Sequence, residues 1–471
     1  MDLVRRVVAF YVAALLAACD ERPSFSKADI DAEKLLGNAP PGFLLGTATA
    51  PHQIEGGLAD DWSDWEQGSY PDGRPHIKHR DTSAVADDSW NRWKDDLAAM
   101  QTLGVNAYRL GVDWSRLMPA PGQWDAAAAA RYREQLAALR AAHIEPMVTL
   151  YHFTLPKWVA AQGGLEWDGL EDALADFAGR SGKAFGDLVD RWCTLNEPNV
   201  VAVKGFTQGE WPPGVKDTPR TARVLARLLR AHAKMAAALR LNDTVDADGD
   251  GKATLIGLAH HVRVFEPATW SPLDVAIAAA SDAFFNDALV QAVKTGHTHL
   301  SVPGAITIDE DVPGLAGSFD YLGLNYYTRD HVRADLSDPS LSKQYTPAGA
   351  PVNDLGWELY PEGLYRMLVR FGRYGWPILI TENGMADNAG DRRPEFLRGH
   401  LYAVDRARAA GVDVRGYYHW SLLDNFEWAE GYTARFGLFT VDFASDPTLA
   451  RKPTPAVAVF QEAARNLGTL R

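Results

Sequence analysis

Cysteine is scarce in this sequence: only Cys19 and Cys193 occur among its 471 residues. Two cysteines can form at most one disulfide, which excludes a small scaffold held together by several disulfides. Positive charge is also in short supply, and the formal net charge is −14. Because an acidic surface repels a phosphate backbone, and because no basic stripe offsets it, nucleic acid is not expected as a partner.

The apolar run at the N-terminus is short. Residues 7–17 form an uncharged stretch of 11 residues that follows Arg5 and Arg6. A bilayer-spanning helix needs about 20 residues, whereas a run of this length is typical of a secretory signal peptide. The next residues, Leu-Ala-Ala-Cys ending at Cys19, resemble a bacterial lipobox, in which the cysteine is acylated and becomes the new N-terminus.

We therefore expect a lipoprotein-type signal peptide over residues 1–19 and a polar tether over residues 20–38. The lipid on Cys19 would hold the protein at the periplasmic face of the cell envelope, and this anchor would be its only contact with a membrane. Two alternatives stay open: an ordinary signal peptide, and a frayed N-terminal helix on a cytoplasmic protein.

No glycine-rich phosphate loop follows the first predicted strand, which disfavours a nucleotide-binding fold. Instead, strand-like apolar runs alternate with helical patterns from residue 41 onward. The runs cover residues 43–49, 106–112, 145–152, 191–197, 254–262, 319–327, 377–382 and 414–421. Eight such units predict an α/β protein with a single-domain (β/α)₈ (TIM) barrel over residues 39–471. Periodicity alone leaves a doubly wound sheet as an alternative.

Polar side chains gather at the C-terminal ends of these runs. In a closed barrel such ends converge on one face, where barrel enzymes place their active sites. Burying acidic and amide groups there is costly unless they serve a purpose. The residues in question are Arg109, His152, Asn196, Glu197, Asn325, Tyr327, Glu382 and Trp420.

Two acidic segments stand out, Thr-Leu-Asn-Glu-Pro around Glu197 and Ile-Thr-Glu-Asn-Gly around Glu382. With several other segments they resemble glycoside hydrolase family 1, the β-glucosidase family. Each segment alone is a weak signal, but all occur in the family's order, and the resemblance spans residues 41–467. The other segments are residues 48–56, 149–152, 323–327, 420–428 and 435–438.

This resemblance implies a retaining hydrolase of β-D-glucosides and related O-glycosides. Glu382 would attack the anomeric carbon while Glu197 protonates the leaving oxygen, and water activated by Glu197 would then hydrolyse the glycosyl-enzyme. Retaining enzymes hold such carboxyl groups about 5–5.5 Å apart. At that distance an ionised Glu382 is expected to raise the pKa of Glu197.

The resemblance also implies supporting roles. Arg109, Asn325 and Tyr327 would support the nucleophile, with Arg109 keeping it ionised and Tyr327 donating a hydrogen bond to it. Asn196 would bind the sugar 2-hydroxyl. The remaining substrate-binding positions are Gln53, His152, Trp420 as the floor under the ring, Glu427 and Trp428.

The identity of residue 427 bears on the sugar. The 6-phosphoglycosidase branch of the family carries serine with a nearby lysine there, so Glu427 favours an unphosphorylated sugar. A small-molecule β-glycoside is the expected partner, and neither a cofactor nor a catalytic metal is expected. His52 stands where many family members carry tyrosine.

Residues 246–251 (Asp-Ala-Asp-Gly-Asp-Gly) have the spacing of the start of an EF-hand. The twelfth position is Gly257 rather than glutamate, so we expect a plain turn, with a calcium loop as the alternative. Two alternatives concern function: a non-catalytic sugar-binding barrel, and a transglycosylase using the same residues. The sequence leaves the glycone, the aglycone and the oligomeric state undetermined.

Overall fold

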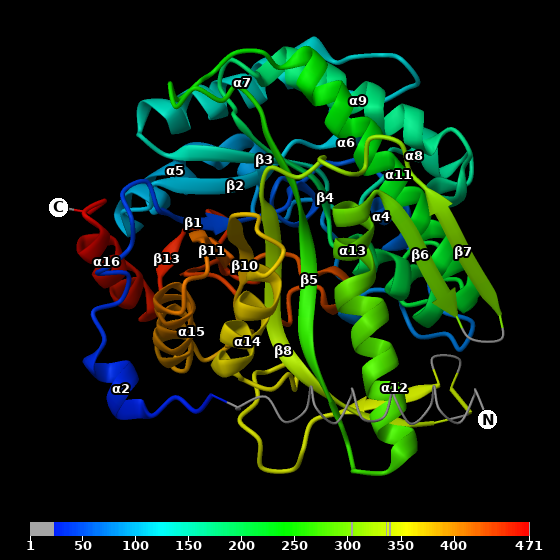
Figure 1. Ribbon diagram of the computed structural model, residues 1–471. Helices are drawn as coiled ribbons and strands as arrows, with labels where there is room; N and C mark the ends of the chain where they lie inside the picture. The colour runs from blue at the N-terminus through cyan, green and yellow to red at the C-terminus, as the bar shows by residue number, and fades with distance from the viewer. Residues whose placement is uncertain (1–22, 303–304, 336, 339–340, 471) are drawn as a thin grey trace.

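The computed structural model describes residues 23–302, 305–335, 337–338 and 341–470, and confirms the predicted barrel. Eight parallel strands follow one another around it, and pairing of β10 with β8 and of β11 with β1 closes the ring (Figure 1). The strands are β1 (Leu44–Ala48), β2 (Ala107–Gly111), β3 (Glu145–Tyr151), β4 (Arg191–Asn196), β5 (Leu255–Pro267), β8 (Leu322–Ala334), β10 (Ile378–Asn383) and β11 (Val414–Trp420).

Helices surround the barrel and bury one apolar face each. The long α11, for example, buries Leu225, Leu228 and Leu239 while its arginines reach solvent-side carboxylates. The larger helices are α5 (Ser89–Leu103), α7 (Ala126–Ala141), α9 (Leu170–Phe185), α11 (Thr218–Asn242), α12 (Pro272–Asp282), α13 (Ala288–Thr295), α14 (Pro361–Gly372), α15 (Arg393–Ala409) and α16 (Ala456–Leu467). Short helices on the catalytic face include α3 (Pro51–Ile54), α4 (Asp61–Trp65), α6 (Trp114–Leu117), α8 (Lys157–Ala160) and α10 (Pro198–Ala202).

Some elements were not predicted. Helix α9 packs closely against α11, and the tightest approach is at Gly179 of α9, where a Cβ would lie 3.1 Å from Asn242 Nδ2. The antiparallel hairpin of β6 (His297–Val302) and β7 (Ile306–Asp311) projects beside α11. Strand β9 (Ser342–Tyr345) pairs antiparallel with the end of β8. A further small pair joins β12 (Phe439–Thr440) to β13 (Lys452–Pro453). None of the described helices combines the length and the apolar character needed to cross a bilayer.

The barrel strands are buried on both faces, which explains their near-continuous apolar runs. All five residues of β2 are buried, and successive side chains point to opposite sides. Tyr108 and Leu110 pack outward against α5 and α7, while Arg109 points into the barrel. This alternation places a charged guanidinium inside an otherwise apolar strand.

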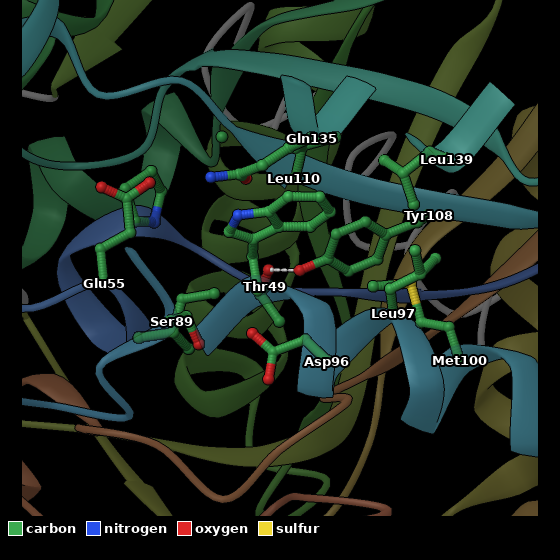
Figure 2. Close-up of a pocket in the computed structure, with 14 residues that line it drawn as sticks. Thr49, Glu55, Ser89, Asp96, Leu97, Met100, Tyr108, Leu110, Gln135 and Leu139 are labelled. Atoms are coloured by element: carbon green, nitrogen blue, oxygen red, sulfur yellow. Dashed lines mark hydrogen bonds between the residues drawn. The ribbon is translucent and has the colours of Figure 1, made fainter. Parts of the chain in front are cut away.

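A small cavity lies between β2 and its covering helices, on the side of the strand opposite Arg109. Figure 2 shows Glu55, Asp96 and Tyr108 around it, with Tyr108 hydrogen-bonded to Thr49 at 2.5 Å. Its volume of about 30 Å³ is close to that of one water in the liquid, so no sugar fits there. This cavity belongs to the packing of the barrel wall.

The segment expected to be a tether is packed against the barrel helices over its described part. Residues 27–32 form α2, and the buried Leu35 and Leu36 follow it. Phe25 stacks edge-on against Tyr402 of α15, and the Leu36 amide donates to Asp405 at 2.8 Å. The apolar residues of this stretch are spaced among polar ones, so the sequence showed no apolar run that would have predicted their packing. The signal peptide, including Cys19, lies outside the described residues.

Candidate active site

A cavity of about 240 Å³ opens at the C-terminal ends of the barrel strands. A (β/α)₈ barrel concentrates its chemistry at this end, because eight strand ends meet there. Its walls bring together residues that are far apart in the chain: His152, Asn196, Glu197, Tyr327, Glu382, Trp420, Glu427 and Trp428. Every one of these was singled out from the sequence.

Glu382, near the end of β10, is held by a cation and a phenol. The Arg109 guanidinium donates through Nη1 to Oε1 of Glu382 at 2.5 Å, and the Tyr327 hydroxyl donates to Oε2 at 2.7 Å. Arg109 is fully buried and Glu382 nearly so. Each carboxylate oxygen therefore has a directed donor, and the orientation of the group is restricted.

Glu197 follows β4 directly and caps α10. Its φ of +44° lies in the left-handed region, which is unusual for a residue with a side chain and is found disproportionately at functional sites. Oε1 of Glu197 accepts from Asn325 Nδ2 at 2.8 Å and lies 2.8 Å from His261 Nδ1. Both contacts fall on the same oxygen.

Two amides link the carboxyl groups into one network. Asn196 Oδ1 accepts from Arg109 Nη2 at 2.8 Å and from Asn325 Nδ2 at 3.2 Å. Asn325 thus contacts both Asn196 and Glu197, and its own oxygen accepts from Thr381 beside Glu382 at 2.7 Å. These hydrogen bonds form a continuous path between the surroundings of the two carboxyl groups.

The two carboxyl groups are buried in the same cavity, and their titrations differ. Burial and the charge of Glu197 raise the pKa of Glu382 to about 7, against the opposing effects of Arg109 and Tyr327. Burial also favours neutral Glu197, but His261 and Asn325 outweigh it, and the pKa of Glu197 is lowered. The pair therefore holds one proton until about pH 7. For Glu197 the direction is opposite to that expected from its neighbour alone, because the sequence did not reveal the donors on Oε1.

Of the remaining predicted binders, His152, Trp420, Glu427 and Trp428 line the inner end of the cavity, whereas Gln53 is buried beside Glu427 and is not part of the lining. Gln53 of α3 donates to Glu427 Oε2 at 3.1 Å, and Asn196 Nδ2 lies 3.0 Å from His152 Nε2. Among the described residues, Gln53 Oε1 and His152 Nδ1 are buried without a hydrogen-bond partner. The ring of Trp420 stacks near His152, with 5.8 Å between centroids. A flat indole beside unpaired polar atoms suits a sugar ring with its hydroxyl groups.

Glu427 differs from the sequence-based expectation in its charge. Burial and the charge of Glu382 raise the pKa of Glu427 to about 8, so the group is largely protonated at neutral pH. It can then both donate and accept a hydrogen bond. Direct charge repulsion is consequently a weaker reason for excluding phosphorylated sugars than the sequence suggested.

The sequence reading missed residues at the outer end of the cavity. His261 and Arg263 of β5 line it, together with the aromatic walls Trp211, Trp357 and Phe436. The strand-end rule that found the other polar residues would have found His261 too, since it lies at the end of the run predicted over 254–262. The aromatic walls come from loops, for which no sequence pattern was available.

His52 lies just behind the inner end of the cavity. Its Nδ1 is 2.8 Å from Asp60 Oδ2, its Nε2 is 3.0 Å from Glu66 Oε1, and its ring stacks on Trp428 with an interplanar angle of 4°. Burial lowers the pKa of the imidazole, but the two carboxylates prevail and raise the pKa of His52 to about 10. A buried cation therefore supports the indole of Trp428.

The acidic loop of residues 246–251 closes on its own backbone. Asp246 accepts from the amides of Gly249 at 2.7 Å and Gly251 at 2.8 Å. Asp246, Asp248 and Asp250 still lie close enough together to hold an ion, and all belong to exposed or half-buried positions. None of these residues lines the cavity.

A closed parallel barrel that presents an arginine-paired carboxyl group and a second carboxyl group to one cavity defines a class: barrel enzymes that cleave glycosidic bonds with two carboxyl groups. Known proteins narrow this class. The family model of glycosyl hydrolase family 1 matches residues 36–469.

Three relatives illustrate the similarity. A 1,4-beta-D-glucan glucohydrolase from Thermotoga neapolitana is 36% identical over 426 residues, covering 86% of this chain and 98% of that protein. Beta-glucosidase A from Thermotoga maritima is 35% identical, covering 88% and 95%. A solved Thermotoga maritima beta-glucosidase in complex with glucoimidazole has a TM-score of 0.82 and 31% identity, covering 91% and 99%. The chain belongs to glycosyl hydrolase family 1 and is a β-glucosidase-type glycoside hydrolase.

The buried His52 cation leads to a stability prediction. Its pKa is raised above the unfolded value of about 6.5, so its stabilisation is complete below that pH and disappears as pH rises towards 10. From pH 7.5 to 9.5 the loss amounts to about 2–3 kcal/mol. We expect His52→Gln to lower the melting temperature strongly at pH 7.5 and much less at pH 9.5.

The matched control is His232→Gln. His232 is also buried with two partners, Thr194 and Ser318, but burial lowers the pKa of His232 to about 3, so it stays neutral. Its melting-temperature difference from the wild type should be the same at both pH values. Equal behaviour of the two variants would contradict a charged His52.

Proposed function

We propose that this enzyme hydrolyses unphosphorylated β-D-glucosides and related O-glycosides with retention, using Glu382 as nucleophile and Glu197 as acid and base. The observation that carries the proposal is the placement of Glu382 between Arg109 and Tyr327, in the same cavity as Glu197. The named activity of the relatives supports the substrate class.

In the first step, an oxygen of Glu382 bonds to the anomeric carbon as the bond from that carbon to the leaving oxygen breaks. Glu197 gives its proton to the leaving oxygen, and the aglycone departs as an alcohol. Arg109 favours the ionised form of the attacking group against the burial that raises its pKa, because a guanidinium stays charged at every relevant pH. Tyr327 orients the second oxygen of Glu382 through its hydroxyl.

In the second step, Glu197 removes a proton from water, whose oxygen bonds to the anomeric carbon as the ester to Glu382 breaks. Esterification neutralises Glu382, so the charge that disfavoured ionised Glu197 is gone. The pKa of Glu197 is then expected to fall further, which suits a base. The sugar leaves with its original anomeric configuration after two inversions.

The inner end of the cavity is proposed as the site of the sugar. Trp420 would face the ring, and Gln53, His152, Asn196, Glu427 and Trp428 would bind its hydroxyl groups. Gln53 Oε1 and His152 Nδ1 supply an acceptor and a donor that are unpaired within the described part of the chain. A phosphate ester would have to lose its water beside Glu427 and Glu382, which favours an unphosphorylated sugar. The non-catalytic alternative is disfavoured because both carboxyl groups line the cavity.

The N-terminal segment supports a proposal about location. We infer that Cys19 is lipidated and that the enzyme is anchored at the cell envelope, with a cytoplasmic location as the alternative. The described chain begins at residue 23 and packs against α14 and α15 from Phe25 onward, where the Phe25 amide donates to Glu362 at 3.0 Å. The free tether would therefore be much shorter than residues 20–38. Cys193 is buried inside the barrel and has no disulfide partner among the described residues.

The assignment of the carboxyl groups is tested with a panel of nitrophenyl β-glycosides, including a 6-phosphoglucoside. Glu382→Gln should lose on the order of 10⁴-fold or more in kcat, because no nucleophile remains. Glu197→Gln should lose about 10²–10⁴-fold on poor leaving groups and less on dinitrophenolate, which needs no proton. Glu430→Gln, at the cavity mouth and paired with Lys78, is the control and should stay within a few-fold of wild type. Faster turnover of the phosphorylated substrate would contradict the proposed glycone.

The dependence of kcat/KM on pH tests whether Glu197 and Glu382 share one proton. Because the first step needs one proton on the pair, kcat/KM should fall about tenfold per pH unit above about pH 7, where that proton is lost. Glu427→Gln should bind more weakly but keep this limb, since Glu427 titrates about one unit higher. A flat profile to pH 9 would be inconsistent with a single proton on the pair.

Lipidation is tested by fractionation of the native host or of a bacterium that processes lipoproteins. The wild type should be recovered with membranes, and Cys19→Ser should move to the soluble fraction. Cys193→Ser is the control and should fractionate like the wild type, because that thiol is buried. Identical fractionation of Cys19→Ser and wild type would end the proposal.

A further inference from the structure

Strand β5 contributes a chain of polar contacts that ends on Glu197. Asp330 Oδ2 accepts from Arg263 Nη1 at 2.8 Å, and Arg263 Nη2 lies 3.1 Å from His261 Nε2. His261 Nδ1 in turn lies 2.8 Å from Oε1 of Glu197. The pairing of β5 with β8 holds the outer end of this chain, because Phe265 and Asp330 are in register.

The proton positions follow from the chemistry of the donors. A guanidinium can only donate, so His261 Nε2 must accept from Arg263 and cannot carry a proton. Burial lowers the pKa of His261, and the ring is neutral at neutral pH. The single ring proton is therefore on Nδ1, and His261 donates to Glu197.

Two donors then converge on one oxygen of Glu197. Both His261 Nδ1 and Asn325 Nδ2 contact Oε1 at 2.8 Å, so a proton on that oxygen would collide with theirs. Among the described residues, no contact of this kind holds Oε2. The two oxygens of the same carboxyl group are thus in different surroundings.

We propose that His261, held by Arg263 and Asp330, is a positioning residue that reserves Oε2 of Glu197 for proton transfer. In the first step Oε2 delivers its proton to the leaving oxygen, and in the second step the same atom removes the proton from water. His261 keeps its own proton throughout. The inference rests on the proposed function, because it assigns a direction to the acid and base of that reaction.

The surroundings of His261 support this role over that of a proton carrier. Its ring stacks on Tyr327 at 5.7 Å and meets Phe285 edge-on at 5.6 Å, which fixes the ring plane. The titratable and charged groups that face it are Glu197 from β4, His260 and Arg263 from β5, and Tyr327 and Asp330 from β8. Arg263 and Asp330 pair with each other at 2.8 Å.

The sign of the effect on Glu197 follows. A donor on Oε1 stabilises the ionised carboxylate, so removal of the donor should raise the pKa of Glu197. With dinitrophenyl β-glucoside the first step needs no acid, and kcat reports the second step, in which Glu197 must be ionised. His261→Phe should therefore move the acidic limb of kcat to higher pH by about one unit.

Further variants distinguish a positioning role of His261 from a general loss of structure around Glu197. His261→Asn keeps an amide donor near the place of Nδ1 and should restore the limb to within a few tenths of a unit. Arg263→Met removes the donor on Nε2, so the ring can move its proton away from Glu197, and the shift should lie between the other two. The control is His260→Phe. His260 is also buried on the same strand, but it contacts the Asn286 carbonyl at 2.8 Å, so the acidic limb of kcat in this variant should stay where it is in the wild type.

Leaving-group dependence supplies a second readout. His261→Phe should lose about 10–100-fold in kcat/KM on alkyl glucosides and little on dinitrophenyl glucoside, because a misdirected proton matters only for leaving groups that need one. A uniform loss on both substrates, or an acidic limb that His261→Phe leaves in place, would overturn the inference while the proposed function stands. Failure of the wild type to cleave either substrate would instead overturn the proposed function.

Discussion

The buried ion pair of Arg109 and Glu382 is the interaction around which the barrel interior is arranged. Removing two charges from water costs several kcal/mol per ion, and this cost is offset only if the remaining donors and acceptors find partners. Arg109 meets that condition with Thr149, Asn196 and Glu382, at distances of 2.5–3.0 Å. The Tyr327 hydroxyl donates a hydrogen bond to the other oxygen of Glu382. The strands that carry these residues must therefore keep their register if the site is to survive.

The same network sets the two carboxyl groups apart. Glu382 receives a permanent cation and a phenol on separate oxygens, whereas Glu197 receives two neutral donors on one oxygen. A carboxyl group with both oxygens engaged is restricted in geometry, and one with a single engaged oxygen has a defined free end. Division of labour between two identical side chains thus arises from their neighbours, as it does in other carboxyl pairs.

Much of the fold was predictable because barrel strands buried on both faces read as continuous apolar runs. All eight were placed to within a few residues, although β5 and β8 extend well beyond the predicted ends where they pair with each other outside the barrel. The packed part of the presumed tether was missed because its few apolar residues contact distant helices.

The two carboxyl groups, Arg109 and Tyr327 could be located from residue type and place in the chain, since polar groups at the ends of apolar strands are costly to bury without a purpose. What depends on contacts across the barrel could not be located in this way. The charge of His52, the protonation of Glu427 and the tautomer of His261 each follow from contacts that only the fold creates, even where the partner is as near in the chain as Arg263 is to His261. The sequence by itself determined that the two carboxyl groups and most of the polar residues around them meet at the barrel mouth. Only the tertiary structure decided which atoms of those residues are paired and which are free, because proton positions depend on distances of a few ångströms between strands.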